Sequence, residues 1–326
     1  MRIAVIGGSG HIGTFLMPRL VRAGHDALNL SRGTSRPYRD DPAWTDVTAL
    51  TVDREAEDAA GTFGSRVAAL GADVVVDLIC FTPASATALV QAIRGATGQL
   101  LHCGSIWRYG NSRKLPVRED DTSPPFGEYG IQKAAIADLL AAETSGGGLA
   151  TTVLHPGHIS GPGWTPIGPL GNLDPQVWHA ISAGEEIAIP GLGTELMHHV
   201  HADDVAQAFA LAVEHPQESA GEAFNVVAPS ALTVRGYLEL ASHWFGRPLR
   251  TRSVSWTEFQ DGTTPEFADT SWQHLRRSQY ASIDKARTLL GFAPAFEPED
   301  AILDAVRWLI DHGQLDVARP LRSEID

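Results

Sequence analysis

The sequence predicts an α/β protein with a doubly wound parallel sheet, followed by a smaller, mostly helical C-terminal lobe. Residues 1–155 alternate short apolar runs with stretches of helical periodicity, which is typical of βαβ units. The run Val74–Val76 is wholly apolar, as expected of a strand that helices cover on both faces. A glycine-rich turn, Gly7–Gly13, joins the first apolar run to the first helical stretch.

The elements of this first part follow from their apolar patterns and from the residues that end them. Arg2–Ile6 is an apolar run ending in glycines, so we expect a buried strand. His11–Ala23 has apolar residues at helical spacing and stops at Gly24. The other expected strands are Ala27–Leu30, Val47–Val52, Asp73–Ile79, Gln99–Cys103 and Ala150–Leu154, and the other expected helices are Glu55–Leu70, Pro83–Arg94 and Tyr129–Glu143.

The pattern changes after residue 156. Pro156–Pro175 is rich in proline and glycine and predicts a long loop. Expected helices follow at Asp204–Glu214, Thr233–Phe245, Ile283–Leu290 and Pro298–His312, with short strands near Ile187–Ile189 and Ala223–Val227. We expect residues 1–170 to form the sheet domain, segments near 195–230 to return to it, and residues 171–326 to form most of the lobe.

Composition excludes several classes of protein. The chain has 326 residues and a net charge of −14, and no basic run offsets that charge, so we expect no nucleic-acid partner. No apolar stretch is long enough for a signal peptide or a membrane span, so we expect a cytoplasmic protein without a membrane partner. Cys80 and Cys103 end strands that could be neighbours; a disulfide stays open, but reduced core thiols fit the cytoplasm better.

The turn Gly7-Gly8-Ser9-Gly10-His11-Ile12-Gly13 fits two glycine templates, G-x-G-x-x-G from Gly8 and G-x-x-G-x-x-G from Gly7. Such glycines allow positive φ, close approach of a pyrophosphate and tight packing of helix on strand. The helix that starts near His11 points free N–H groups at the phosphates. The context, after a strand and before a helix, predicts a dinucleotide-binding (Rossmann) domain rather than an ordinary tight turn. The expected cofactor contacts here are Gly7, Gly10, His11, Ile12 and Gly13.

The end of the second strand indicates which dinucleotide binds. A site selective for NAD places Asp or Glu there, but this strand ends Leu30-Ser31-Arg32-Gly33. Ser31 and Arg32 offer a hydroxyl and a cation to a 2′-phosphate, so NADP(H) is preferred, with NAD(H) possible. Asp53, at the end of the third strand, is a candidate to contact the adenine amino group; the alternative is that it caps a helix.

A catalytic group is indicated by Tyr129-Gly130-Ile131-Gln132-Lys133, because residues four apart share one face of a helix. An ammonium beside a phenol favours the phenolate and lowers the pKa of the tyrosine. Ser105 follows the fifth strand, at the sheet edge where open α/β sheets bind ligands, so its hydroxyl can bond the same substrate oxygen. Lys133 can also bind the nicotinamide ribose.

This order of motifs resembles the extended (atypical) short-chain dehydrogenase/reductase family, also known as the NAD-dependent epimerase/dehydratase family. Further segments that resemble it are Ser105/Tyr109-Gly110, Leu154-His155-Pro156-Gly157, Gly161-Pro162-Gly163, His201–Ala206 and Phe224-Asn225-Val226. The resemblance implies that Ser105 polarises the carbonyl, Tyr129 is the acid/base, and Lys133 lowers the tyrosine pKa and holds the cofactor. It also implies a possible homodimer through the helix that bears Tyr129.

Departures from the family pattern narrow the substrate. Ile106 and Trp107 stand where family dehydratases carry an acidic pair, and Met197 stands where nucleotide-sugar enzymes often carry an arginine. Methionine cannot replace an arginine fork on a diphosphate, so a nucleotide-sugar substrate is disfavoured. The expected substrate-binding residues form an apolar and aromatic set with histidines: Trp107, His158, Trp164, Met197 and His199. No ligand set beyond neighbouring histidines supports a metal, so none is expected.

Three functions remain from the sequence. The first is an NADP(H)-dependent oxidoreductase that moves a hydride between nicotinamide and a carbonyl or alcohol carbon of a small organic substrate. The second is a nucleotide-sugar epimerase that holds NAD tightly. The third is a non-catalytic dinucleotide-binding or nucleic-acid-binding relative, against which the catalytic residues and the net charge of −14 both count.

Overall fold

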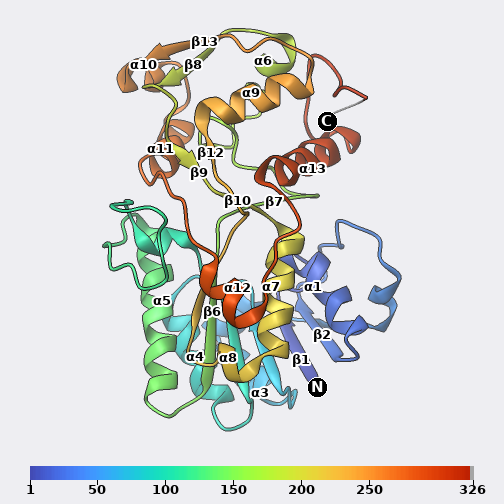
Figure 1. Cartoon of the computed structure of the whole chain (residues 1–326). Helices are drawn as coiled ribbons and strands as arrows, with labels where there is room; N and C mark the ends of the chain where they lie inside the picture. The colour runs from blue at the N-terminus through green and yellow to red at the C-terminus, as the bar shows by residue number, and fades with distance from the viewer. Residues whose placement is uncertain (324–326) are drawn as a thin grey trace.

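The structure, a computed structural model, describes residues 1–323. Over these residues the main sheet has seven strands, all parallel, in the order β11-β6-β5-β4-β1-β2-β3. Figure 1 shows this sheet with helices on both faces and the C-terminal lobe stacked against one end. The predicted doubly wound parallel sheet is therefore confirmed.

The strands match the apolar runs of the sequence. They are β1 Arg2–Ile6, β2 Asp26–Ser31, β3 Thr48–Thr51, β4 Val74–Asp77, β5 Gln99–Cys103, β6 Ala150–Pro156 and β11 Ala223–Val226. The chain runs outward from β1 to β2 and β3, and then returns to place β4 on the other side of β1. This reversal opens a crevice at the carboxyl ends of β1 and β4, where doubly wound sheets bind their ligands.

Helices cover both faces of the sheet, and the side chains of β1 point alternately into the core on each face. Ile3 and Val5 face one core, built from α1 (His11–Arg22), α7 (Ala202–Glu214) and α12 (Asp284–Leu290). Ala4 and Ile6 face the other core. Its helices are α3 Phe63–Ala68, α4 Pro83–Ile93 and α5 Glu128–Ser145. Apolar side chains on both faces explain why these strands read as continuous apolar runs.

Two expectations about local structure were wrong. The single helix expected over Glu55–Leu70 is two helices, α2 (Arg54–Ala59) and α3, because Gly61 between them has a φ of +68° and ends the first. The long loop expected over Pro156–Pro175 contains a short strand, β7 (His158–Ser160), which pairs in parallel with β10 (His199–His201).

The C-terminal lobe has its own core, which includes Trp178, Met197 and Tyr237. Its helices are α6 Gln176–Ala183, α9 Val234–Trp244, α10 Trp256–Asp261, α11 Pro265–Leu275 and α13 Pro298–Asp311. Short strand pairs connect them: β8 Ile187–Pro190 with β13 Thr251–Val254, and β9 Leu196–Met197 with β12 Leu232–Thr233. Between these segments the chain returns to the sheet through α7, the short helix α8 (Pro216–Ser219) and β11 (Figure 1). Two 3-10 turns, η1 Pro42–Asp46 and η2 Ile106–Tyr109, complete the elements described.

Two further features concern membrane-spanning helices and the state of the cysteines. In residues 1–323, no helix has the length and apolar character that a bilayer crossing requires. Cys80 and Cys103 are both buried free thiols near the ends of the neighbouring strands β4 and β5.

Candidate active site

A cavity of about 820 Å³ opens at the carboxyl ends of β1, β2 and β3, beside the glycine turn. The residues predicted for cofactor binding that line it are Gly7, Gly10, Ser31, Arg32 and Asp53. Its far wall comes from the segment after β4 and from the first turns of α4. The position is that of the crevice expected for a dinucleotide in a doubly wound sheet.

The glycine turn leaves no room for side chains. Gly7 has a φ of +87°, and a Cβ on Gly13 would lie 2.1 Å from the carbonyl oxygen of Gly8. The turn closes with a hydrogen bond of 3.0 Å from Gly10 N to Gly7 O. Because α1 begins directly after this turn, its free N–H groups face the cavity side of the sheet, and the residues present fit a pyrophosphate.

His11 and Trp164 form a stack above the start of α1. Their ring centroids are 4.8 Å apart at an interplanar angle of 21°. Burial, with His201 nearby, lowers the pKa of His11 to about 3, so its imidazole is neutral at physiological pH. Ile12 instead packs into the core. Trp164 was expected to bind substrate; its ring lies against the glycine turn.

The rim of the cavity carries the residues expected to choose the cofactor. Arg32 is exposed there, and none of the ion pairs found within residues 1–323 includes it. The carboxylate of Asp53 accepts a hydrogen bond of 3.1 Å from Ala56 N and so caps α2, while the residue also lines the cavity. Of the two roles considered for Asp53, the cap is present, and contact with adenine stays a prediction.

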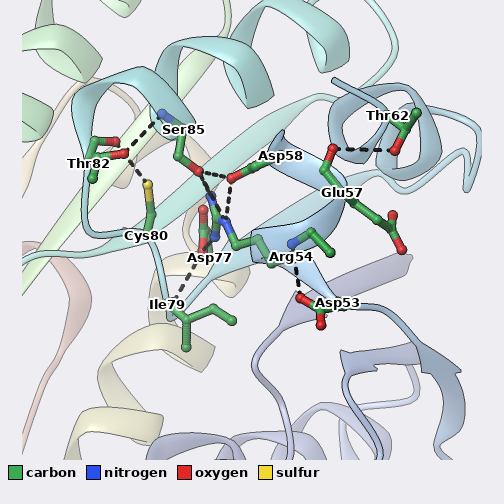
Figure 2. A network of polar contacts seen from close by, with 11 residues as sticks. Asp53, Arg54, Glu57, Asp58, Thr62, Asp77, Ile79, Cys80, Thr82 and Ser85 are labelled. Carbon is green, nitrogen blue, oxygen red and sulfur yellow. Dashed lines mark hydrogen bonds and ion pairs between the residues drawn. The ribbon is translucent and has the colours of Figure 1, made fainter. Parts of the chain in front are cut away.

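Arg54, next to Asp53, is the centre of a buried polar network in the cavity wall (Figure 2). Its guanidinium lies 2.5 Å from the Asp77 carboxylate, 3.0 Å from the Ser85 hydroxyl and 3.4 Å from Asp58. Desolvation lowers the pKa of Arg54, but the charge and hydrogen bond of Asp77, with Cys80 and Asp58 nearby, together outweigh it and leave the pKa above its usual range. Asp58 lies one turn along from Arg54 on α2, but Asp77 and Ser85 come from β4 and α4, so local sequence patterns do not signal those two pairings.

Lys133 is buried next to Tyr129, the predicted acid/base. Its ammonium donates to the carbonyl oxygens of Cys80 at 2.8 Å and Cys103 at 2.7 Å, and lies 5.7 Å from the centre of the Tyr129 ring. Burial lowers the pKa of Lys133, while the groups at the strand ends oppose that shift. The lysine is therefore held in one place near the ends of β4 and β5, and its ammonium lies 4.9 Å from the ring centre of Phe81, which lines the cavity.

Ser105 and Tyr129 meet next to this lysine. Burial raises the pKa of Tyr129 to about 12, and a side-chain hydrogen bond with Ser105 acts in the opposite direction. The Ser105 hydroxyl also accepts from Trp107 N at 3.2 Å, and Ser105 N donates to His155 Nδ1 at 3.2 Å. Tyr129 is 42% exposed as a whole residue, while its phenol is buried deeply enough for desolvation to be the main cause of its raised pKa.

A chain of aromatic and imidazole rings leads from Tyr129 into the C-terminal lobe. Trp107 lies 5.7 Å from Tyr129 and 4.7 Å from His274. His158 follows, 4.9 Å from His274 and 5.2 Å from His199, its neighbour in the β7–β10 pair. The structure thus brings together Trp107, His158 and His199 of the predicted substrate set, and adds His274.

Met197 was expected among these residues but lies elsewhere. Its side chain is fully buried in the core of the C-terminal lobe, where β9 pairs with β12. Trp178 is buried in the same core. A short apolar strand next to histidines is equally compatible with a buried core position and with a pocket wall. In this structure Met197 takes the core position.

Asp77, Cys80 and His102 place three potential metal-ligand atoms within 4.8 Å of one another beneath the site. Asp77 already pairs with Arg54, and the Lys133 ammonium bonds the Cys80 carbonyl. Two cations beside the group oppose a divalent metal. These residues form polar packing near Lys133, and the expectation that the chain uses no metal stays a prediction.

Residues 3–227, about two thirds of the chain, match the model of the NAD dependent epimerase/dehydratase family. The chain belongs to this family. A 2′-dehydrokanamycin reductase of Streptomyces kanamyceticus is 27% identical, over 100% of this chain and 89% of its own length. A dTDP-6-deoxy-L-talose 4-dehydrogenase (NAD(P)(+)) of Kitasatospora kifunensis is 31% identical, over 92% of this chain and 93% of its own. The family and these relatives make the chain an enzyme of the extended short-chain dehydrogenase/reductase type.

One family relative is named for another activity. The chloroplast stem-loop binding protein of 41 kDa b of Arabidopsis thaliana is 28% identical, over 100% of this chain and 82% of its own length. Among solved structures, the Bordetella bronchiseptica enzyme WbmG in complex with NAD superposes with a TM-score of 0.70 at 18% identity, covering 98% of this chain and 97% of that one. That likeness supports the fold.

Proposed function

We propose that this chain is an NADP(H)-dependent oxidoreductase that transfers a hydride between nicotinamide and a carbonyl or alcohol carbon of a small organic molecule. One observation carries the proposal: the Ser105 hydroxyl, the Tyr129 phenol and the buried Lys133 ammonium converge beside the cavity at the glycine turn. This trio supplies what carbonyl reduction needs at the oxygen, namely a hydrogen-bond donor, a proton donor and a charge that stabilises the phenolate.

Each residue has a defined task in the reduction direction. The dinucleotide, when bound, supplies the hydride that adds to the carbonyl carbon. The Ser105 hydroxyl donates a hydrogen bond to the carbonyl oxygen, and Tyr129 transfers its phenolic proton to that oxygen as the C–O double bond becomes single. The ammonium of Lys133 then stabilises the phenolate, which regains a proton from solvent. Oxidation of an alcohol runs through the same steps in reverse.

The preference for NADP(H) rests on the cavity rim. Arg32 lies there without an ion-pair partner among the described residues, and Ser31 beside it offers a hydroxyl. A guanidinium is a strong ligand for a 2′-phosphate. The relative from Kitasatospora kifunensis is named for both dinucleotides, so its name is compatible with either choice.

The substrate proposed is a small organic carbonyl compound or alcohol that packs on Trp107 and approaches His158, whereas His199 is fully buried and supports the His158 ring from behind. These residues lie on the path from Tyr129 into the C-terminal lobe. Trp164 joins this set only if the substrate extends toward the glycine turn, where the indole stacks on His11. Met197 is not assigned to the pocket, because its side chain is in the core.

A nucleotide-sugar epimerase with tightly held NAD is the second candidate, and the family description favours it. It predicts turnover of a UDP-sugar without net consumption of added cofactor. Binding of nucleic acid is the third, supported by the Arabidopsis thaliana relative and opposed by the net charge of −14.

A substrate screen decides among these functions. Carbonyl compounds and alcohols are incubated with NADPH or NADP⁺ and followed by NADPH absorbance, and UDP-sugars are followed by product analysis with no added cofactor. Turnover of a carbonyl compound with NADPH supports the proposal. Interconversion of a UDP-sugar without added cofactor, or no cofactor-linked turnover beside tight binding of RNA stem-loops, would overturn it.

We also propose a cytoplasmic site of action and a homodimer through α5. Free buried thiols at Cys80 and Cys103 fit a reducing compartment. Ile131 on α5 is 46% exposed, next to the catalytic tyrosine, and would be covered in such a dimer. Sedimentation analysis of the wild type and of Ile131→Asp tests the dimer.

A further inference from the structure

Arg277 is a buried arginine with an unusual environment. It lies between α11 and α12 and is 1% exposed. Its guanidinium is sandwiched between the rings of Trp107, 3.8 Å away, and Phe126, 3.9 Å away. None of the ion pairs found within residues 1–323 includes it, and burial, with Arg276 nearby, lowers its pKa to about 10.

The two rings belong to the two segments that carry the catalytic hydroxyls. Trp107 lies in η2, which Ser105 caps, and Phe126 immediately precedes Gly127, the residue that begins α5 and leads to Tyr129. Arg277 also donates to Phe126 O at 2.6 Å, so it contacts both the ring and the backbone of the residue that precedes α5. Its second hydrogen bond, to Gln273 O at 2.5 Å, anchors it to α11 of the C-terminal lobe.

Neighbouring contacts tighten the same junction. Gln279, two residues after Arg277, donates its amide to Ile106 O at 2.8 Å and Gly110 O at 3.3 Å, at both ends of η2. A Cβ on Gly130 would lie 2.8 Å from Trp107 O and 3.3 Å from the Arg277 guanidinium. The start of α5 therefore packs directly on η2, and residues 277 and 279 contact both of these segments.

Stability alone does not explain an arginine at this place. A buried cation without an acidic partner costs desolvation, and an apolar side chain of similar volume fills such a space without that cost. An arginine can stack between two aromatic rings and donate hydrogen bonds in fixed directions, which an apolar side chain cannot do. These properties matter if η2 and the start of α5 must be held in defined positions.

We infer that Arg277 is a positioning residue that holds the Ser105 turn and the Tyr129 helix at their working distance. The inference rests on the proposed oxidoreductase function for its catalytic consequence, but the clamp itself is defined by contacts that do not depend on any substrate. It makes the C-terminal lobe a part of the catalytic machinery rather than only a cover for the substrate.

The test compares Arg277→Met and Arg277→Lys with a matched control, Arg276→Met. Arg276 also lies over Phe126, at 4.4 Å, but it is exposed and its second aromatic partner is Trp272, at 5.7 Å, rather than Trp107. Lysine keeps the charge but cannot stack as a plane or donate in two fixed directions. If Arg277→Met does not fold, Arg277→Lys carries the test.

Hydrogen–deuterium exchange tests, without any turnover, whether the contacts of Arg277 with Trp107 and Phe126 hold the two segments in place. In the Arg277 variants we expect faster exchange at residues 105–110 and 127–131, with unchanged exchange at the glycine turn and unchanged NADPH affinity. Arg276→Met should match the wild type. Equal protection of both catalytic segments in the wild type and in the Arg277 variants would overturn the inference, whether or not a substrate has been found.

Kinetics measures the catalytic consequence. We expect kcat to fall roughly tenfold to a hundredfold in Arg277→Met, with a smaller change in KM, because a small misplacement of catalytic groups is costly. The Ser105 hydrogen bond lowers the pKa of Tyr129, so loss of alignment should also move the alkaline rise of alcohol oxidation to higher pH. Global destabilisation would lower the amount of active enzyme but leave that profile in place.

Chemical rescue gives a further readout. In Arg277→Ala, free guanidinium at concentrations below those that unfold the protein should restore part of kcat, while urea should not. A rise in KM restricted to anionic substrates, with normal kcat and normal protection, would instead make Arg277 a substrate ligand and overturn the positioning role.

Discussion

The ammonium of Lys133 lies 5.7 Å from the centre of the Tyr129 ring, directly below the residue whose proton the proposed reaction moves. Two backbone carbonyls, from the ends of β4 and β5, hold this ammonium in place. The edge of the sheet therefore fixes the position of this ammonium, although burial still holds the pKa of Tyr129 above its usual value in the absence of a ligand.

Tyr129→Phe should abolish turnover and leave cofactor binding intact. Loss of the acid/base group is expected to lower kcat by about 10²–10⁴-fold, because no other group donates a proton to the substrate oxygen. Turnover is followed by NADPH absorbance and binding by NADPH fluorescence. Tyr280→Phe, whose ring lies against His198 instead, is the control. Undiminished activity of Tyr129→Phe would remove this residue as the acid/base.

Arg32→Ala should weaken binding of NADPH about tenfold or more and leave NADH affinity nearly unchanged. The reason is that a charge-assisted hydrogen bond to the 2′-phosphate is lost, whereas NADH has no such phosphate. Titration of both cofactors with the wild type and the variant measures the effect. Arg36→Ala, in the same loop but not lining the cavity, is the control. Equal affinities of the wild type for NADPH and NADH would contradict the assignment.

Arg54→Met should destabilise the fold by about 3–5 kcal/mol, because it leaves the Asp77 carboxylate buried without its partner. Urea unfolding measures the loss. The double variant Arg54→Met/Asp77→Leu should recover most of it, since the orphan charge is gone. At the surface pair Arg94–Glu143, where the arginine side chain is 53% exposed, Arg94→Ala should change stability little. A neutral effect of Arg54→Met would show that the network is not structural.

The buried histidines should make the protein less stable in mild acid. Burial lowers the pKa of His199 to about 3, and of His198 and His274 to about 4, below the value of about 6.5 in an unfolded chain. Above about pH 6.5 neither state binds these protons. As the pH falls from there toward 4, the unfolded state takes them up first, so each histidine lowers the free energy of unfolding by up to about 1.4 kcal/mol per pH unit.

Urea unfolding at several pH values in this range measures that slope. His199→Gln should reduce the slope by about one proton, because one buried imidazole is removed. Substitution of His312, which is exposed, should leave it unchanged. A stability that stays constant between neutral pH and pH 5 would contradict the neutral state of the cluster.

Local sequence patterns predicted most of the helices and strands of the fold. The strand β1, the turn Gly7–Gly13 and the first helix were all visible because apolar periodicity and turn glycines act between neighbours in the chain. The break at Gly61 shows the limit, since a single residue with positive φ divided a stretch that reads as one helix. Short strands such as β7 were not foreseen, because their pairing with β10 depends on a partner about forty residues away.

The candidate site divides in the same way. The sequence by itself predicted Ser105, Tyr129 and Lys133 as a set, since two of them share a helix face and the third follows a strand. Only the tertiary structure decided that Met197 is in the core, that Arg54 pairs with Asp77, and that Arg277, 151 residues after Phe126, joins the two catalytic segments. The physical reason is that these contacts link groups from different layers of the fold, where burial and charge pairing are set by the packing of whole elements rather than by adjacent residues.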